Sequence, residues 1–328
     1  MPPEFQTHLL ELPTSAAGLR LDQALAAALP QYSRARLQRW IRQGAVRLAG
    51  KAARARERVR GGEQVVVEAQ FAPDHTVGAE ALALDIVHED RDLLVLNKPA
   101  GLVVHPGAGN RAHTLQNALL AHDAGLARVP RAGLVHRLDK LTSGLLIVAR
   151  TPEVHTRLVA QLAAREIGRE YLALVAGLPT GGGRINQPIG RHRSVRTRMA
   201  VRADGREAVT HFRIEERFRA HTLLRVQLET GRTHQIRVHL AHIGFPIVGD
   251  PVYGGRKRLL AGGAGPLNLA LQSFRRQALH AQRLRLQHPL SGRAQSFEAP
   301  IPADLEALLR LLRLDAREAE AARGRRRP

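Results

Sequence analysis

The residues best suited to chemistry lie in one short segment, residues 136–144, whose sequence is HRLDKLTSG. Asp139 stands between Arg137 and Lys140, and nearby cations favour the ionised form of a carboxylate. An ionised carboxylate can act as a nucleophile or as a general base. An apolar run, residues 145–149, follows directly and places the acid at the mouth of a buried strand. A salt-bridged structural Asp at a strand start is the alternative interpretation.

Two other segments carry groups that suit the same kind of site. Tyr171 opens an apolar strand expected at residues 171–175, although many tyrosines in such positions are simply half-buried. Residues 183–206 contain seven arginines and a single acid, Asp204. A loop with this charge is either disordered or ordered by RNA, and the charge of the whole chain favours RNA.

A helix with a basic first turn is expected close after Arg232. Thr233 suits its N-cap, and Gly244 is expected to end it. With Arg232 and Arg237 nearby, the N-terminus of this helix favours an anion. Three histidines lie along the same segment: His234, His239 and His242. They lack an adjacent acid in the helical metalloprotease spacing and any soft ligand, so no metal is expected.

The composition of the chain favours a nucleic-acid partner. Its 328 residues include 50 Lys and Arg against 29 Asp and Glu, which gives a formal net charge of +21. Cations that meet phosphates release counterions, so such an excess favours binding to a polyanion. An aromatic content of 3% disfavours a sheet that reads bases by stacking. The absence of cysteine excludes disulfides, iron–sulfur clusters and thiolate nucleophiles.

No apolar run of membrane-spanning length and no signal-peptide pattern is found in the sequence. A cytoplasmic location is therefore expected, and a membrane partner is not.

Residues 18–72 are expected to form a small RNA-binding domain, after an irregular leader at residues 1–17. A first helix is indicated by the spacing of Leu21, Leu25 and Leu29, and Ser33 suits the N-cap of a second helix. Two short strands are expected at residues 45–48 and 64–68.

This small domain is strongly basic, with ten cations against one acid between residues 33 and 60. The order of its helices and strands and its Arg-rich second helix resemble the S4-like RNA-binding domain. The resemblance implies that Arg34, Arg36 and Arg39 contact RNA.

Beyond a linker at residues 73–80, residues 81–316 are expected to form a second domain that mixes strands with helices. Thr114 and Thr151 suit the N-caps of two of its helices. Its strands are expected at residues 82–87, 93–97 and 224–228, with a hairpin of residues 284–288 and 294–299. The mixture predicts an α+β fold built on a mixed, largely antiparallel sheet, and residues 317–328 are expected to form a charged, frayed tail.

Over nearly the whole chain, these segments resemble the RluA family of pseudouridine synthases. The most specific matches are HRLD and GRTHQIRVH, and further matches are KPAGLVVHPG, REIGREYLALV and HIGFPIVGDPVYG. The resemblance implies the pseudouridine synthase fold. It also implies an enzyme that detaches uracil from its ribose, rotates it and rejoins it through a carbon, with no cofactor and no group donor.

The same resemblance assigns roles to individual residues. Asp139 matches the catalytic aspartate, which attacks the sugar or the base or abstracts a sugar proton. Tyr171 matches the residue that stacks on the target base, and Arg237 the arginine that pairs with the aspartate. Arg137 would fill the gap left by the flipped nucleotide. The other residues expected at the RNA are His136, Thr142, Gly144, Arg232, His234 and Gln235.

The resemblance further implies a substrate: uridines in one stem-loop of large-subunit ribosomal RNA, free or in an assembling large subunit. A monomer is expected. Two alternatives stay open, namely the same chemistry on another ribosomal or transfer RNA uridine and a non-catalytic ribosome-assembly factor. A methyltransferase is not favoured, because the glycine-rich residues 262–265 do not follow a convincing strand.

Overall fold

The structure is a computed structural model that describes residues 4–30, 32, 34–71, 77–107, 110, 112–195, 197–255 and 265–324. The chain divides into two compact units, Met1–Thr76 and Val77–Pro328. Ser33, expected as an N-cap, and residues 73–76, half of the expected linker, lie outside the described residues.

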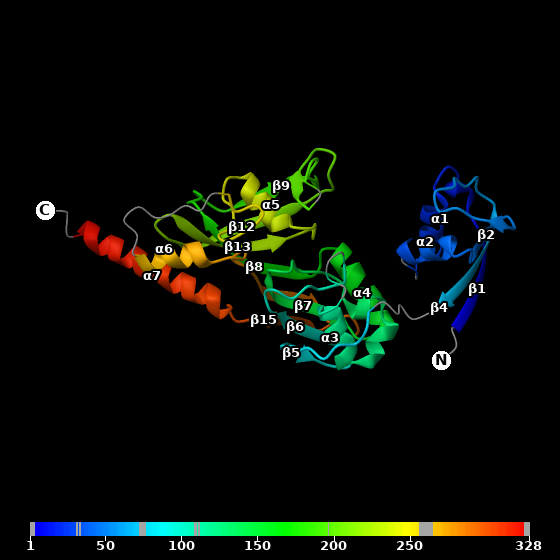
Figure 1. Ribbon diagram of the computed structural model, residues 1–328, viewed down its shortest axis with the longest axis horizontal. Coiled ribbons are helices and arrows are strands. Elements are labelled where there is room, and N and C mark those ends of the chain that lie inside the picture. The colour runs from blue at the N-terminus through cyan, green and yellow to red at the C-terminus, as the bar shows by residue number, and fades with distance from the viewer. Residues whose placement is uncertain are drawn as a thin grey trace. The chain divides into compact units, whose positions relative to one another are not determined.

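The first unit is a four-stranded antiparallel sheet with two helices (Figure 1). The strand order is β1-β4-β2-β3, with β1 at Glu4–Glu11, β4 at Gln64–Phe71, β2 at Val46–Leu48 and β3 at Lys51–Ala52. The helices α1 (Leu21–Ala28) and α2 (Arg34–Arg42) confirm the two expected from the sequence. A short 3-10 helix, η1 (Thr14–Ala16), precedes α1. The core of the unit includes Leu25, Trp40 and Val65.

Strand β1 shows that the expectation of an irregular leader is wrong for residues 4–11. This strand pairs with β4 along its whole length. It lies at the edge of the sheet, where the backbone bonds hold it while side chains such as Leu9 stay 78% exposed. Because its side chains bury little, the segment lacks the alternation by which a strand is found in a sequence.

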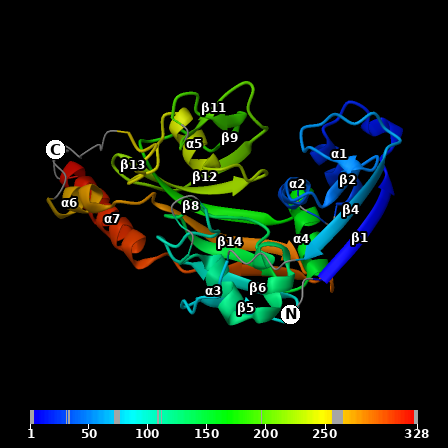
Figure 2. The same ribbon diagram turned by 45° about the vertical axis from the view of Figure 1, so that its right-hand side comes forward.

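The second unit is built on a nine-stranded sheet, in which β14 lies between β7 and β8 (Figure 2). The order is β5 (Ile86–Glu89), β6 (Leu93–Lys98), β7 (Ser143–Ala149), β14 (Leu279–Gln287), β8 (Gly168–Ala176), β13 (His221–Leu228), β12 (Val209–Arg217) and β9 (Gly183–Asn186), with β15 (Ala294–Glu298) paired to β14. Among the described strands of this sheet, only β7 and β14 pair in parallel. The largely antiparallel sheet and the β14–β15 hairpin are therefore confirmed. A separate two-stranded sheet joins β10 (Ile189–Arg191) to β11 (Met199–Val201).

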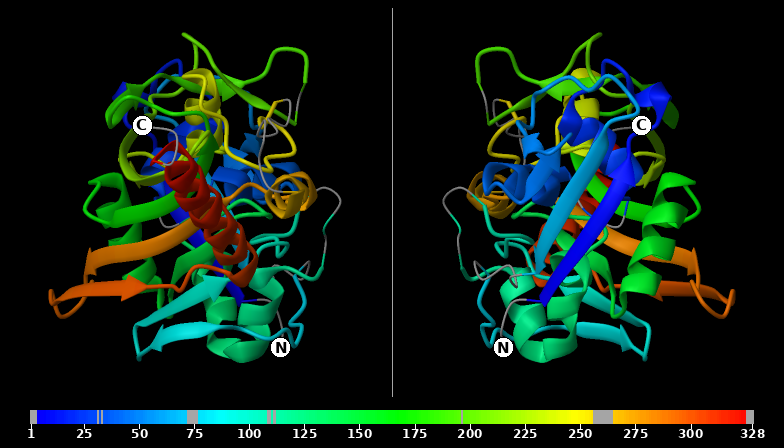
Figure 3. Two further views of the ribbon diagram at one scale, coloured as in Figure 1. Left: turned by 90° about the vertical axis from the view of Figure 1, so that its left-hand side faces the viewer. Right: turned by 90° about the vertical axis from the view of Figure 1, so that its right-hand side faces the viewer.

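Helices cover both faces of the large sheet. On one face α4 (Pro152–Ala163) packs over β7 and β14, as shown by the cluster that includes Val154, Ile147 and Leu284. The main core on the other face involves α3 (Leu115–His122), α5 (Gln235–His242), α6 (Gly265–Ser273) and α7 (Ala303–Gly324). Helices α6 and α7 lie against each other (Figure 3). Covered on both faces, β7 buries every one of its side chains, which explains its unbroken apolar sequence.

The local signals at the starts of α3 and α4 are confirmed. The side chain of Thr114 accepts a hydrogen bond from the backbone N–H of Asn117, and that of Thr151 accepts one from Val154. Pro152 occupies the first turn of α4, where the missing N–H is not needed. Two 3-10 helices, η2 (Ala124–Arg128) and η3 (Pro130–Gly133), connect α3 to the segment that carries Asp139.

Two expectations for this unit are corrected. The strand expected at residues 82–87 begins only at Ile86, since Leu82 and Leu84 line a hollow against α3 instead of joining the sheet. The tail expected to fray is helical as far as Gly324, because its Ala, Glu and Arg residues are strong helix formers. In the part of the chain that is described, none of the helices combines the length and the apolar character needed to cross a membrane.

Candidate active site

Asp139 lies in a tight loop between η3 and β7, and its neighbours anchor that loop. The backbone N–H of Thr142 donates to the carbonyl of Asp139 at 3.0 Å, which closes a turn. The Thr142 hydroxyl accepts a hydrogen bond from Gln277 at 2.9 Å. Gly144 has a φ of +112°, and a Cβ placed there would lie 2.2 Å from the carbonyl oxygen of Ala281. Only glycine lets β7 approach β14 this closely, so the loop is fixed at its strand end.

Arg237, from α5, holds the carboxylate of Asp139. Its Nη1 donates to Asp139 Oδ2 at 2.9 Å, and its Nε and Nη2 donate to Asp250 at 2.7 and 2.9 Å. Burial alone would lower the pKa of Arg237, but its bonds to Asp250 and the charge of Asp139 raise it above the ordinary value. Arg237 is therefore a permanent cation, and it fixes one oxygen of Asp139 in position.

Asp250 is the second partner of that arginine, and sequence reasoning missed it. Its side chain is fully buried, and Oδ1 also accepts the backbone N–H groups of Val252 and Tyr253 at 2.8 and 3.0 Å. Burial raises the pKa of Asp250, but the bonds from Arg237 and the two N–H groups lower it overall. The segment GDPVYG gave no signal beyond its place in the family resemblance.

His234 lies on the other side of Asp139 and is oriented by Tyr253. Its Nδ1 lies 2.8 Å from the Tyr253 hydroxyl, and its Nε2 lies 3.9 Å from Asp139 Oδ1. The same hydroxyl accepts the backbone N–H of Met199 at 2.8 Å, so its own proton points to His234 Nδ1. Burial lowers the pKa of His234, and the neutral ring then presents its Nε2–H to Asp139.

Tyr171 lies in β8 and is buried. Burial raises the pKa of its phenol, and the charges of Arg169 and Asp139 act on it in opposite directions. The phenol therefore stays protonated at neutral pH, with a ring that belongs to the main core of the unit.

Lys98 is a further charged group beside the loop of Asp139, and it begins the segment KPAGLVVHPG of the family resemblance. Its side chain is 1% exposed, and its Nζ donates to the carbonyls of Pro99, Leu102 and Lys140. Burial lowers the pKa of Lys98 to about 7, although the negative charge of Asp139 acts to raise it. The available signal was a lysine at the end of the apolar strand LLVLNK.

The residues expected at the RNA separate into accessible and internal groups. Arg137 is exposed and Arg232 and His234 are half-buried. Thr142 and Gly144 are buried, which contradicts a direct RNA contact at either position. His136 accepts the backbone N–H of Ile147 at 3.1 Å through Nε2, so this atom holds the loop.

Gln235 is also internal, and the expected cap of α5 is wrong. The side-chain carbonyl of Gln235 accepts from the Thr230 hydroxyl at 2.8 Å and from the Arg232 N–H at 2.9 Å, and its amide donates to Val209 and Thr210. The N-cap of α5 is His234, in the left-handed region at φ +57°, and not Thr233. No side chain caps this helix, and Gln235 instead ties the segment before it to β12.

In the first unit, Arg34 is held by Asp22, whose carboxylate is fully buried. Asp22 accepts hydrogen bonds from Arg20, Arg34 and Gln38. Burial would raise the pKa of Asp22, but the hydrogen bonds from Gln38 and the two arginines lower it. Arg36 is half-buried and Arg39 is exposed. The three expected RNA contacts therefore differ, since Arg34 also serves the fold.

A second polar cluster, at the β5–β6 turn, has the spacing of a metal site without its chemistry. Asp90, Asp92 and His288 are the one group with metal-ligand spacing in the described part of the chain. His288 Nδ1 accepts the backbone N–H groups of Leu290 and Ser291, so its Nε2 carries the proton and donates towards the carboxylates.

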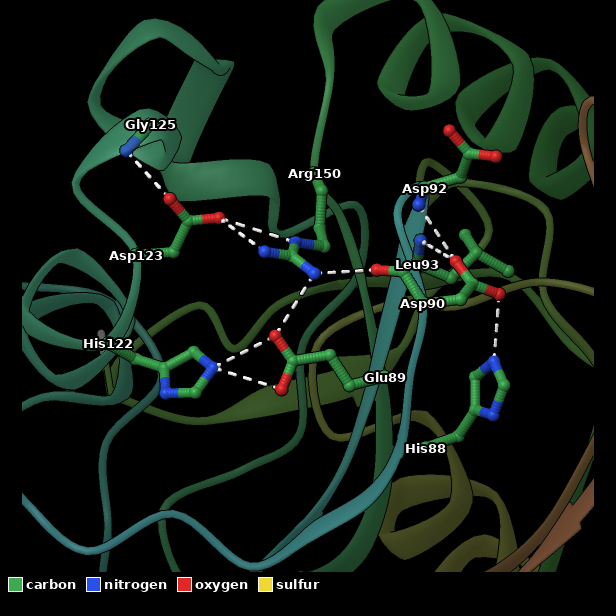
Figure 4. A network of polar contacts seen from close by, with 9 residues as sticks. All are labelled: His88, Glu89, Asp90, Asp92, Leu93, His122, Asp123, Gly125 and Arg150. Atoms are coloured by element: carbon green, nitrogen blue, oxygen red, sulfur yellow. Dashed lines mark hydrogen bonds and ion pairs between the residues drawn. The ribbon is translucent and has the colours of Figure 1, made fainter.

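The surrounding network is structural (Figure 4). Arg150 bonds to Glu89, Asp123 and the carbonyl of Asp90, and so ties the end of β7 to the edge strand and to η2. His239, expected to be no metal ligand, bonds to Thr210 and Gln187 inside the fold.

Known proteins share both units of this chain. The family model for RNA pseudouridylate synthase matches residues 92–242, and the S4 domain model matches residues 19–65. A protein of Xanthomonas campestris named ribosomal large subunit pseudouridine synthase D is 53% identical, over 95% of both chains. The protein of that name from Pseudomonas aeruginosa is 53% identical, over 93% of this chain and 95% of its own.

A solved structure shares the fold of the second unit. Human RNA pseudouridylate synthase domain containing 4 is 26% identical, with a TM-score of 0.57, over 70% of this chain and 93% of its own.

Proposed function

The chain belongs to the RluA family of RNA pseudouridine synthases, and we propose that it isomerises uridines of large-subunit ribosomal RNA. The observation that carries this proposal is the carboxylate of Asp139, held by Arg237 at 2.9 Å at a partly open site in a chain of net charge +21. The relatives that match over most of their length carry a name that specifies the large ribosomal subunit. In this proposal, Asp139 acts on the flipped nucleotide as nucleophile or base.

The other residues have supporting roles in the proposed reaction. Arg237 fixes one oxygen of Asp139, which leaves the other oxygen free to face the nucleotide. Tyr171 offers a protonated phenol and a ring face to the base. Arg137 is exposed beside the acid and suits the place left by the flipped uridine. The reaction rearranges one nucleotide and needs no group donor.

The RNA contacts proposed outside this centre are Arg232, Arg36 and Arg39, and His234 is proposed to contact the RNA beside Asp139 as a neutral ring. The three arginines contact the phosphate backbone and set the orientation of the RNA without reading its sequence. We place the boundary of the RNA-binding domain near residue 72 and assign residues 81–316 to catalysis. We further propose that the protein acts as a cytoplasmic monomer on ribosomal RNA or on an assembling large subunit.

An isosteric variant tests the chemistry. Asp139→Asn keeps the size of the side chain and removes the charge that acts on the nucleotide. We expect it to abolish tritium release from 5-labelled uridine in ribosomal RNA and to leave RNA affinity within about twofold, because many cations bind the RNA. Turnover in this variant would refute the role of Asp139.

The target is tested by mapping pseudouridines in total RNA from cells with and without the gene. Loss of modification in large-subunit ribosomal RNA is expected. Loss confined to transfer RNA would retain the chemistry and overturn the proposed substrate.

A further inference from the structure

A buried arginine beside the site has no partner among the residues that the structure describes. Arg169, in β8 on the same strand as Tyr171, is only 8% exposed. Its Nε is buried and makes no hydrogen bond. Throughout the described residues, no hydrogen-bond or ion-pair partner is found for its guanidinium.

The other buried arginines are satisfied. Three arginines are buried in the described part of the chain, namely Arg169, Arg237 and Arg276. Arg237 is bonded to two carboxylates, and Arg276 makes a two-bond pair with Asp304 at 2.6 and 2.7 Å. Of these three arginines, Arg169 is the one for which the described residues supply no carboxylate partner.

An uncompensated buried cation opposes folding. Removing a charge from water costs several kcal/mol per ion, and a guanidinium needs bonded acceptors to recover that cost. A side chain kept in this state is explained most simply by an anion that binds to it. In a protein that acts on RNA, the anion at hand is a phosphate group.

The neighbours of Arg169 do not compete for its charge. His136 is neutral, because burial and the charge of Arg169 lower its pKa to about 3. Gly231 has no side chain, and a Cβ placed there would lie 3.0 Å from Arg169 Nη1. Arg169 and Tyr171 are two residues apart in β8, so their side chains lie on the same face of the sheet. The charges of Arg169 and Asp139 both act on the phenol of Tyr171.

We propose that Arg169 binds one phosphodiester group of the substrate RNA beside the target uridine, with Gly231 leaving the approach to its Nη1 open. This site rests on the proposed function, since the phosphate belongs to the strand that carries the uridine. Arg169 is then a substrate-binding residue that is prepared in the free enzyme and neutralised only in the complex.

The test removes one charge at a time from each side of the contact. A ribosomal RNA stem-loop is made with a neutral methylphosphonate at each linkage in turn, and its affinity for the full chain is measured in the Asp139→Asn background. At one linkage next to the uridine, the loss should be about 10–100-fold, because a charge-assisted hydrogen bond is lost. The Arg169→Met variant should bind RNA with the neutral group at that linkage as tightly as it binds the unmodified RNA.

A matched variant and a stability measurement complete the test. Arg313→Met removes a cation that Glu216 already pairs, and it should leave the pattern of linkage effects unchanged. Arg169→Met should melt at the same or a higher temperature than the parent protein in the absence of RNA, because it removes an unpaired buried charge.

A melting temperature lowered by more than about 5 °C would show a structural role and overturn the proposal. Equal losses at every linkage in both proteins would overturn it as well. If one linkage effect depends on Arg169 but the parent chain forms no pseudouridine, the phosphate site is supported and the proposed function is refuted.

Discussion

Asp250 is expected to support both the fold and the reaction. Its buried carboxylate accepts two hydrogen bonds from Arg237 and two from the backbone. Removing one partner of a buried ion pair costs about 3–5 kcal/mol. Since Arg237 keeps its bond to Asp139, we expect Asp250→Ala to cost about 3 kcal/mol, the lower end of that range. For a unit of this size, the melting temperature should fall by about 6–12 °C.

The activity of Asp250→Ala should fall further than its stability suggests. Without Asp250, Arg237 is held by one bond and no longer fixes the oxygen of Asp139. A misplacement of about 1 Å in a catalytic group can reduce a rate about hundredfold. We therefore expect kcat in single-turnover assays to fall by about that factor, at a temperature well below the melting point of the variant.

Glu216 offers a matched control for burial. It also accepts hydrogen bonds from an arginine, Arg313, but both side chains are 34% exposed. A pair open to solvent contributes about 0–1 kcal/mol, so Glu216→Ala should lower the melting temperature by less than about 4 °C and leave kcat unchanged. Equal melting temperatures for the two variants, or a normal kcat for Asp250→Ala, would refute the reasoning.

Two further predictions concern acid stability and RNA binding. The pKa of His136 is lowered to about 3 in the folded protein. Between pH 6.5 and pH 3, the unfolded chain therefore binds a proton that the folded chain does not. As the pH falls through this range, the parent protein should lose stability relative to His136→Gln. Urea unfolding at pH 4.5 and 7.5 should show a change in that difference of about 2–3 kcal/mol, and a constant difference would contradict a neutral buried ring. In the first unit, the double change of Arg36 and Arg39 to Ala should lower the slope of log affinity against log salt by about 1.4–1.8. Arg34→Ala should lower the melting temperature, because Asp22 then loses a partner, and an unchanged melting temperature would contradict a structural role for Arg34.

Features that depend on neighbouring residues were predictable from the sequence. The caps at Thr114 and Thr151, the helix after residue 33 and the hairpin of β14 and β15 each follow from side chains within a few positions. Thr233 failed as a cap: the N-cap is His234, and Gln235 anchors this end of α5 through bonds to residues of β12. A signal that depends on a distant strand is absent from the local pattern.

The site shows the same division. Asp139 was conspicuous by its charge and by the apolar run that follows it, but its bond to Arg237 joins residues 98 positions apart. That pair was reached only through the family resemblance. Asp250, Lys98 and the unpaired Arg169 were not reached at all, because burial and the presence or absence of a partner are properties of the folded chain. An acid or a base looks the same in a sequence whether it is exposed or enclosed.

The position of β14 in the sheet determines how much of the chain must be synthesised before this enzyme can become active. The strand lies between β7, which follows the loop of Asp139, and β8, which carries Tyr171, yet it begins only at Leu279. A growing chain on the ribosome has made both catalytic segments long before the strand that separates them. Until β14 is inserted, the two segments lack their native spacing, and long-range pairing of this kind is slow to form. Most of the chain must therefore be synthesised before the protein can modify RNA. We expect truncation of the chain before β14 to abolish activity, although the truncated chain still contains Asp139, Tyr171 and Arg237.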